Sequence, residues 1–366
     1  MAEYGWNIIF FLVASAVCFF VPSALVSAEL ASTYPERGGV FVWVREAFGP
    51  KYGFLAIFME WVQNLPWYPA AATFVATCLA YTFSPELAHN RWYVFFTTIA
   101  ILWVATVLNF RGMRLSVFLS KSGVLVGTII PGFFLIAIAS AYILTDKPIQ
   151  IPFNGGAALI PDLSTPKQWM LLAGMMVSLA GMEMSSVHVT NMKNPTSAFP
   201  RAIFLASLII LFFSIFGALS VALVVPGTQL SMSAGVCQSF ETMLKALGFS
   251  WFTPILAAFL AYGALASIVT WMNGPSRGLL EVAQEGYLPK YWQTRNSFGM
   301  QTSILILQTG CATFLALSVL VMPSVSDAFW LFLALCGELY MVMYLLMFAA
   351  AIRLKLRYPD KKGSYQ

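Results

Sequence analysis

A carboxylate, an imidazole and several hydroxyls stand close together in the stretch SLAGMEMSSVHVTNMKNP, residues 178–195. The stretch directly follows an apolar run, WMLLAGMMV. Within it, Glu183 comes after Gly181 and shortly before His188. A carboxylate at the centre of a bilayer costs about 2.5 kcal/mol or more, so such a residue indicates a functional site that handles a proton or a cationic group.

The same stretch has the composition of a helix that breaks inside the membrane. Glycine lowers helix propensity and hydroxyl side chains can satisfy freed backbone groups, so we expect a break around residues 178–182. Transporters use such breaks as sites, because carbonyls of the first half bind cations and the second half begins with the positive end of a helix dipole.

Glu183 would stand at the start of the second half, as a proton or pH sensor or as the partner of a substrate amine. His188 would lie beside this site or in an inner vestibule. The alternative is a continuous helix in which Gly181 is a packing notch and Glu183 is hydrogen-bonded to a neighbouring helix.

Two further acids fall inside apolar segments, Glu60 and Glu338. Glu60 lies near the expected end of its span, so its side chain either extends to interfacial water or belongs to a site. A metal centre is not expected, because the chain has only two histidines and its five cysteines show no CxxC spacing. No cofactor is implied.

The composition excludes most soluble classes of protein. The 366 residues are 59% hydrophobic and only 10% charged, whereas soluble domains carry roughly 25% charged residues. The net charge of +5 comes from basic residues in short connectors, where they usually set topology rather than bind nucleic acid. The sequence lacks HExxH and GxGD motifs, so we do not expect an enzyme.

The elements that must position the acids are membrane-spanning helices, and the expected fold is an all-α polytopic membrane protein. Apolar stretches of about 20 residues recur along the chain. They predict nine spans, at residues 7–28, 53–81, 91–109, 122–144, 168–190, 202–225, 251–273, 302–322 and 327–352. Two connectors, 233–247 and 276–289, have helical spacing and are expected on the membrane surface or in a vestibule.

The basic residues predict the orientation of these spans. Of the 20 Lys and Arg residues, all but Arg91, Lys147, Lys167 and Lys245 lie in connectors that follow odd-numbered spans. By the positive-inside rule, this pattern places the C-terminus in the cytoplasm and Met1 outside.

Several strings resemble one family of transporters. SLAGMEMSSVHVTNMKNP with AFPRAI (198–203), GPSRGLLEVAQEGYLP (274–289) and YPERGGVFVWVREAFGP (34–50) are similar to the amino acid, polyamine and organocation transporter superfamily. LSMSAGVCQSF (230–240) and WMNGPSRG (271–278) bring the resemblance closer to the bacterial glutamate:GABA antiporters.

The resemblance implies two inverted repeats of five helices followed by two further helices. This chain would supply helices two to ten, lacking the first helix and the last two. Residues 1–366 would then form one transporter domain. Within it, 1–145 would be the remainder of the first repeat, 168–352 the second repeat and 353–366 a cytoplasmic tail.

The resemblance also implies roles for the residues around the break. The carbonyls of Val177 and Ala180, with Gly181, match positions that bind the substrate amino group, and Glu183 matches a proton- or pH-sensing acid.

The later spans carry the rest of the implied pathway. Tyr340 and Tyr344 match tyrosines that line it, and their spacing of four places them on one helix face. Packing alone is the other interpretation of the two rings. The antiporters have an acid where this chain has Ser267, whereas Glu338 stands where they are apolar, so both are further pathway candidates.

The function implied is amino acid transport by alternating access, as an antiporter of the glutamate/GABA type in the bacterial inner membrane. Its partners would be a small amino acid substrate and the lipid bilayer, with no nucleic acid, and a homodimer is left open. A general amino acid or polyamine permease, and a truncated remnant that does not transport, are the alternatives.

Overall fold

The structure, a computed structural model, describes residues 5–34, 38–145, 147–151, 159–184, 195–226 and 230–360. The regular secondary structure of these residues is helical, apart from one isolated antiparallel bridge between Arg295 and Gln301.

The helices follow one another along the whole described chain. In order they are α1 (Asn7–Ser15), the π-helical η2 (Ala16–Phe20), α2 (Val21–Thr33), α3 (Val40–Phe48), α4 (Pro50–Val62), α5 (Asn64–Phe83), η3 (Pro85–His89), α6 (Arg91–Phe110), α7 (Met113–Val124), the π-helical η4 (Leu125–Ile129), α8 (Ile130–Leu144), α9 (Pro166–Ser178), α10 (Pro195–Val224), α11 (Gly235–Ala246), η8 (Ser250–Phe252), α12 (Thr253–Gln284), η9 (Lys290–Gln293), α13 (Thr302–Ala316), α14 (Ser318–Val321) and α15 (Val325–Arg357).

Seven helical stretches within the described residues are long and apolar enough to cross a membrane, judged by length and composition. They correspond to seven of the nine predicted spans and mostly extend beyond the predicted bounds. The two predicted spans without such a counterpart, 53–81 and 168–190, are each divided in the structure. The expectation of an all-α polytopic membrane protein is confirmed, and the count of nine spans stays a prediction.

The predicted span 53–81 is divided by prolines. Helix α4 ends at Val62 and α5 begins at Asn64, with Gln63 between them. Pro66 has no N–H to donate to the carbonyl of Val62, and Pro69 likewise cannot bond the carbonyl four residues before it. The sequence therefore weakens the helical ladder at mid-segment, beside the polar residues Gln63 and Asn64.

Helix α12 is longer than the sequence indicates. It continues without interruption to Gln284, so the helical pattern expected from residue 276 is confirmed as far as Gln284, but as the end of α12 and not as a connector after a span that ends at residue 273. Pro275 lies inside this helix and cannot donate to the carbonyl of Trp271. That carbonyl instead accepts a hydrogen bond from the Tyr68 hydroxyl on α5, at 3.2 Å. The other predicted connector helix forms as α11 and packs on α8, α10 and α12.

Glycines allow a close helix crossing in the bundle. Gly127, in η4, and Gly263, in α12, lie so near that a Cβ built on Gly127 would stand 2.1 Å from the Gly263 Cα. One turn earlier, a Cβ on Gly123 would stand 2.4 Å from the Ala266 Cβ. Small residues permit such backbone approach between membrane helices, where packing rather than hydrophobic burial drives association.

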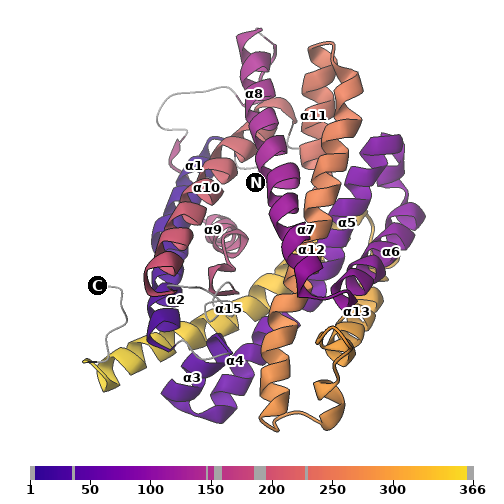
Figure 1. The fold of residues 1–366 in the computed structure, drawn as a ribbon. Helices are drawn as coiled ribbons and strands as arrows, with labels where there is room; N and C mark the ends of the chain where they lie inside the picture. The colour runs from indigo at the N-terminus through magenta and orange to yellow at the C-terminus, as the bar shows by residue number, and fades with distance from the viewer. Residues whose placement is uncertain are drawn as a thin grey trace.

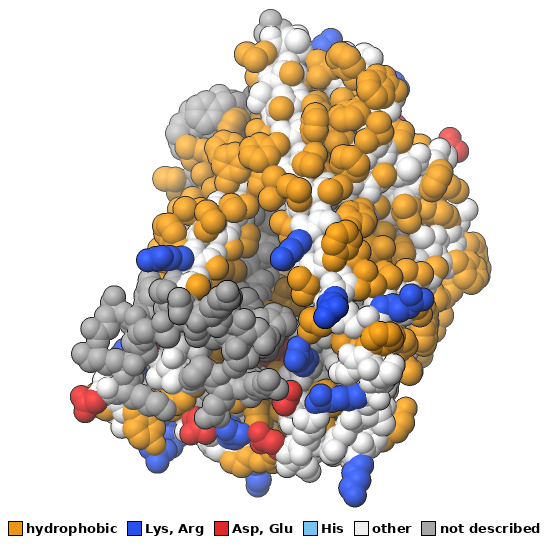
Figure 2. Space-filling model, viewed as in Figure 1, with side chains coloured by type: hydrophobic (Ala, Val, Ile, Leu, Met, Phe, Trp, Pro, Cys, Tyr) orange, Lys and Arg blue, Asp and Glu red, His pale blue; other side chains and the backbone are white. Residues whose placement is uncertain are grey.

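The long helices pack together into one bundle (Figure 1). Helix α5 packs along α12, α15 crosses α3, α4 and α5, and the short α9 contacts α15. Helices α3 and α4 lie at the lower end in this view. Figure 2 shows hydrophobic side chains over the upper part of the same face, with most Lys and Arg side chains lower down. This distribution is the one expected of a chain that meets lipid over much of its surface.

Candidate functional site

Helix α9 breaks where the sequence predicts. It ends at Ser178, and Gly181 adopts a φ of +118°, which L side chains rarely adopt. Residues 182–184 then form a short 3-10 turn. The alternative of a continuous helix through this segment is therefore wrong. The same alternative also expects a hydrogen bond between Glu183 and a neighbouring helix, and the structure has this bond.

Both carboxylate oxygens of Glu183 are held by tyrosines from α15. The Tyr340 hydroxyl donates to Oε1 and the Tyr344 hydroxyl donates to Oε2. The two rings lie 5.0 Å apart on one helix face, and Glu183 is fully buried. Hydrogen bonds to an ionised group are the strong ones, so this contact joins the broken segment firmly to α15.

Aromatic rings close over the glycine of the break. A Cβ on Gly181 would stand 2.8 Å from Cη2 of Trp271 and 3.7 Å from the Tyr340 hydroxyl. Trp271 in turn contacts Trp67 of α5, with ring centroids 5.5 Å apart. Sequence reasoning missed both tryptophans. The available signal was their position well inside apolar segments, because an interfacial tryptophan lies near a span end.

Of the two carbonyls proposed for substrate binding, Val177 and Ala180, that of Val177 already takes part in the turn. The carbonyl of Val177 accepts from the Ala180 N–H at 3.1 Å, and that of Gly181 accepts from the Met184 N–H at 3.3 Å. The side chain of Val177 lies against Gly337 of α15, whose built Cβ would be 3.2 Å from it. A carbonyl has two lone pairs, so a role in binding a substrate ammonium stays a prediction.

The remaining predicted residues lie in different surroundings. Ser267 is half-buried in α12, one turn before Trp271 and on the same face. Glu338 is exposed on α15 and lies apart from the buried cluster of its neighbour Tyr340. His188 lies outside the described residues.

The side chain of Glu60 does not extend to interfacial water, which was one of its two sequence-based interpretations. Its side chain is 2% exposed, because α4 carries it into the protein against α15 and α12. Its carboxyl and that of Glu183 are near enough to repel each other when both are charged. The next polar residue, Gln63, accepts a hydrogen bond from the Cys336 thiol of α15 at 2.9 Å. Glu60 therefore belongs to the same buried polar region as the break.

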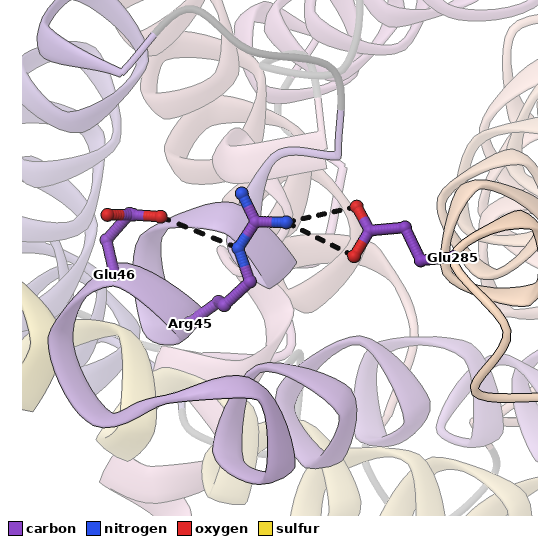
Figure 3. Close-up of polar contacts among 3 residues, drawn as sticks. All are labelled: Arg45, Glu46 and Glu285. Atoms are coloured by element: carbon purple, nitrogen blue, oxygen red, sulfur yellow. Dashed lines mark hydrogen bonds and ion pairs between the residues drawn. The ribbon is translucent and has the colours of Figure 1, made fainter.

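An ion pair joins two elements at the lower end of the molecule. Nη1 of Arg45, in α3, lies 3.0 Å from Oε1 of Glu285, which directly follows α12, and Nε of Arg45 lies 3.5 Å from Glu46 (Figure 3). The Arg45 guanidinium also stands over the ring of Phe41, 5.2 Å from its centroid. These side chains remain partly exposed, so the ion pair stabilises the contact between α3 and the end of α12 only weakly.

Among the residues that the structure describes, no group of three or more His, Cys, Asp or Glu side chains could hold a metal ion. The buried carboxyls of this region can bind protons and polar or charged organic groups.

Known proteins resemble this chain over its whole length. A model of the amino acid permease family matches residues 1–366. An uncharacterised transporter of Legionella pneumophila is 35% identical over 364 residues, covering 100% of this chain and 78% of that protein. A glutamate/gamma-aminobutyrate antiporter of Lactococcus lactis is 30% identical over 365 residues, covering 98% and 72% of the two chains. A probable agmatine/putrescine antiporter of the same species is 24% identical over 363 residues, covering 98% and 76%.

The interrupted helix, its buried acid and the apolar bundle around them agree with these similarities. The chain belongs to the amino acid permease family, within the amino acid, polyamine and organocation transporter superfamily.

Proposed function

We propose that this protein exchanges amino acids across the bacterial inner membrane by alternating access, as an antiporter of the glutamate/GABA type. The observation that carries the proposal is the break of α9 at Gly181, with Glu183 buried between the break and α15. The 30% identity to a glutamate/gamma-aminobutyrate antiporter supports the choice of substrates. The protein's role is transport, without chemical change of the substrate.

Alternating access requires contacts that form in one state and open in another. The hydrogen bonds from Tyr340 and Tyr344 to Glu183 are such contacts, because they span the break of α9 and the middle of α15. Protonation of Glu183 would remove an acceptor oxygen and weaken them. In this proposal Glu183 is the proton- or pH-sensing acid, and the backbone around Val177, Ala180 and Gly181 meets the substrate amino group. The cytoplasmic face is the one that carries Arg45 and the C-terminus.

The direct test is exchange in proteoliposomes. The purified protein is reconstituted into vesicles loaded with GABA, and uptake of labelled glutamate is measured against vesicles without GABA. Antiport requires much faster uptake into the loaded vesicles. Equal filling of loaded and empty vesicles would contradict exchange and favour uniport or an inactive chain.

A pair of glycine variants in one helix tests the part played by the break. Gly181→Ala places a methyl group 2.8 Å from Trp271 in a backbone conformation that alanine rarely adopts, so we expect exchange to be lost. Gly174→Ala is the matched control in α9, because a Cβ there meets nothing within 4 Å. Equal activity of the two variants would show that the break geometry is not needed.

One observation favours a second candidate, a permease for polyamines or other cationic amines. Glu60 and Glu183 are both buried, whereas the buried residues described include no Lys, Arg or His. A negatively charged interior favours cationic substrates. The relative named as a probable agmatine/putrescine antiporter supports the same alternative. Competition by putrescine for labelled glutamate uptake distinguishes the two candidates.

A further inference from the structure

The junction of α4 and α5 carries three polar residues on one face. Glu60, Gln63 and Asn64 have the spacing i, i+3 and i+4, which places their side chains together. Their exposed fractions are only 2%, 1% and 1%. Pro66 interrupts the helical ladder at this point, so the junction is polar in its backbone as well as in its side chains.

Each of these three residues has one polar side-chain atom without a hydrogen-bond partner in the described part of the chain. The atoms are Oε2 of Glu60, Nε2 of Gln63 and Oδ1 of Asn64. Their other contacts hold the side chains in place, because Asn64 Nδ2 donates to the Glu60 carbonyl at 2.7 Å and Gln63 Oε1 accepts from Cys336. Buried polar atoms in proteins are nearly always paired, so an orphaned group of three points to a ligand.

The junction adjoins the break of α9. Cys336, which holds Gln63, lies one turn before Tyr340 on α15, and Tyr340 holds Glu183. A ligand at the junction would therefore stand beside the broken helix.

The three side-chain atoms without a partner favour a ligand that is a cation with N–H donors. Two of the three atoms are oxygen acceptors, and one of these belongs to an acid with no buried basic residue described near it. The described residues include no group of three or more His, Cys, Asp or Glu side chains that could hold a metal ion. An ammonium group carries three donors and a positive charge, so it can satisfy both acceptors and offset the repulsion between Glu60 and Glu183. The donor on Gln63 fits an oxygen of the same ligand or a bridging water.

We propose that Glu60, Gln63 and Asn64 form a subsite for a primary ammonium group of the exchanged substrate. The subsite selects ω-amino acids and diamines over substrates that present a carboxylate at that end. It rests on the proposed function and deepens it, because GABA carries an ω-ammonium group where glutamate carries its second carboxylate.

The test is a binding measurement on the full chain purified in detergent. Labelled GABA is bound to the wild-type protein and displaced by unlabelled GABA, putrescine or glutamate. In Glu60→Gln we expect the Kd for GABA and for putrescine to rise at least tenfold, with the Kd for glutamate unchanged or lower. Glu86→Gln makes the same change at an exposed acid of η3 and is the matched control, expected to leave all three values unchanged.

Two results would overturn the subsite. One is an equal change of Kd for the three ligands in Glu60→Gln, and the other is no change for any of them. If Glu60→Gln does not elute as a folded protein in size-exclusion chromatography, Glu60→Asp replaces it. That variant keeps the charge on a shorter side chain, and it must weaken putrescine more than glutamate.

Binding and exchange separate this inference from the proposed function. Wild-type protein that discriminates ligands through Glu60 but exchanges nothing in proteoliposomes would contradict antiport and keep the ammonium subsite. Exchange that proceeds unaltered in Glu60→Gln, with unaltered GABA and putrescine affinities, would contradict only the subsite.

Discussion

The amide N–H of Gly181 donates a hydrogen bond of 2.7 Å to the hydroxyl of Tyr344. The same hydroxyl donates to Glu183, so one tyrosine connects the backbone of the break to its buried acid. An amide N–H freed from the helical ladder is costly in an apolar interior unless it finds an acceptor. Tyr344 supplies that acceptor from α15, whereas the Tyr340 hydroxyl donates to the carboxylate.

This difference predicts unequal effects of two matched variants. Tyr344→Phe removes an acceptor and a donor, whereas Tyr340→Phe removes only a donor. We expect Tyr344→Phe to lower the free energy of unfolding more, by about 1–3 kcal/mol. Thermal unfolding of the purified proteins in one detergent measures both. A larger loss in Tyr340→Phe would contradict the part assigned to the Gly181 amide.

Glu183→Gln is expected to flatten the pH profile of exchange. In the proposed function, protonation of the carboxylate weakens its contacts with Tyr340 and Tyr344, so exchange should rise as the pH falls. Glutamine cannot take up a proton, and the rise should disappear in the variant. Initial rates of exchange between pH 5 and 8 measure this, with Glu86→Gln as a control that keeps the wild-type profile. An unchanged profile in Glu183→Gln would remove this residue from proton sensing.

The sequence indicates local features of the site better than its long-range contacts. A glycine and an acid inside an apolar run predict the break, because helix propensity and the cost of a buried charge are local properties. The contact between Tyr340 and Glu183 joins residues 157 positions apart, and no local pattern specifies it. The sequence leaves open whether Glu60 extends to water or belongs to a site, because only tertiary packing shows that the side chain is buried where α4 meets α15 and α12.

The ends of membrane helices are also hard to predict from the sequence. Pro275 favours a boundary after residue 273, yet α12 continues because Tyr68 compensates the carbonyl that proline leaves without its helical donor. The same kind of residue does divide the earlier segment at Gln63, within the junction of α4 and α5. Whether proline ends a membrane helix thus depends on a partner that the chain brings from elsewhere.

The crossing of η4 and α12 predicts a stability effect far from the site. In Gly263→Val the new Cβ would stand 2.5 Å from the Gly127 Cα, so the helices must separate. We expect a loss of about 1–3 kcal/mol in the free energy of unfolding, as in other overpacked positions. Gly310→Ala in α13 is the control, because its Cβ meets nothing within 4 Å and alanine favours a helix. Equal melting temperatures would show that the crossing tolerates separation.

The pair of Arg45 and Glu285 is expected to contribute little to stability. The two side chains are 24% and 42% exposed, and exposed pairs contribute about 0–1 kcal/mol. A double-mutant cycle of Arg45→Ala, Glu285→Ala and the combined variant, measured by thermal unfolding, should give a coupling energy in this range that falls as salt is added. A coupling above about 2 kcal/mol that salt does not reduce would show instead that the pair is shielded from water.

Two cysteines offer a distance check on the packing of α11 against α5. The thiol of Cys237 donates to Sγ of Cys78 at 3.4 Å, and both side chains are fully buried. A disulfide has a sulfur–sulfur distance of about 2.05 Å, so a small approach of α11 toward α5 would allow the bond to form.

With a membrane-permeable oxidant such as copper phenanthroline, each thiol loses a proton and an electron to the oxidant, and the two sulfurs bond. We expect peptide mapping without reductant to show a link between residues 78 and 237, and dithiothreitol to remove it. The exposed Cys18 is the internal control, since it should not join this link. A Cys78→Ser variant that still shows a link through Cys237, or wild-type protein in which Cys78 links elsewhere, would place α11 differently from the position described here.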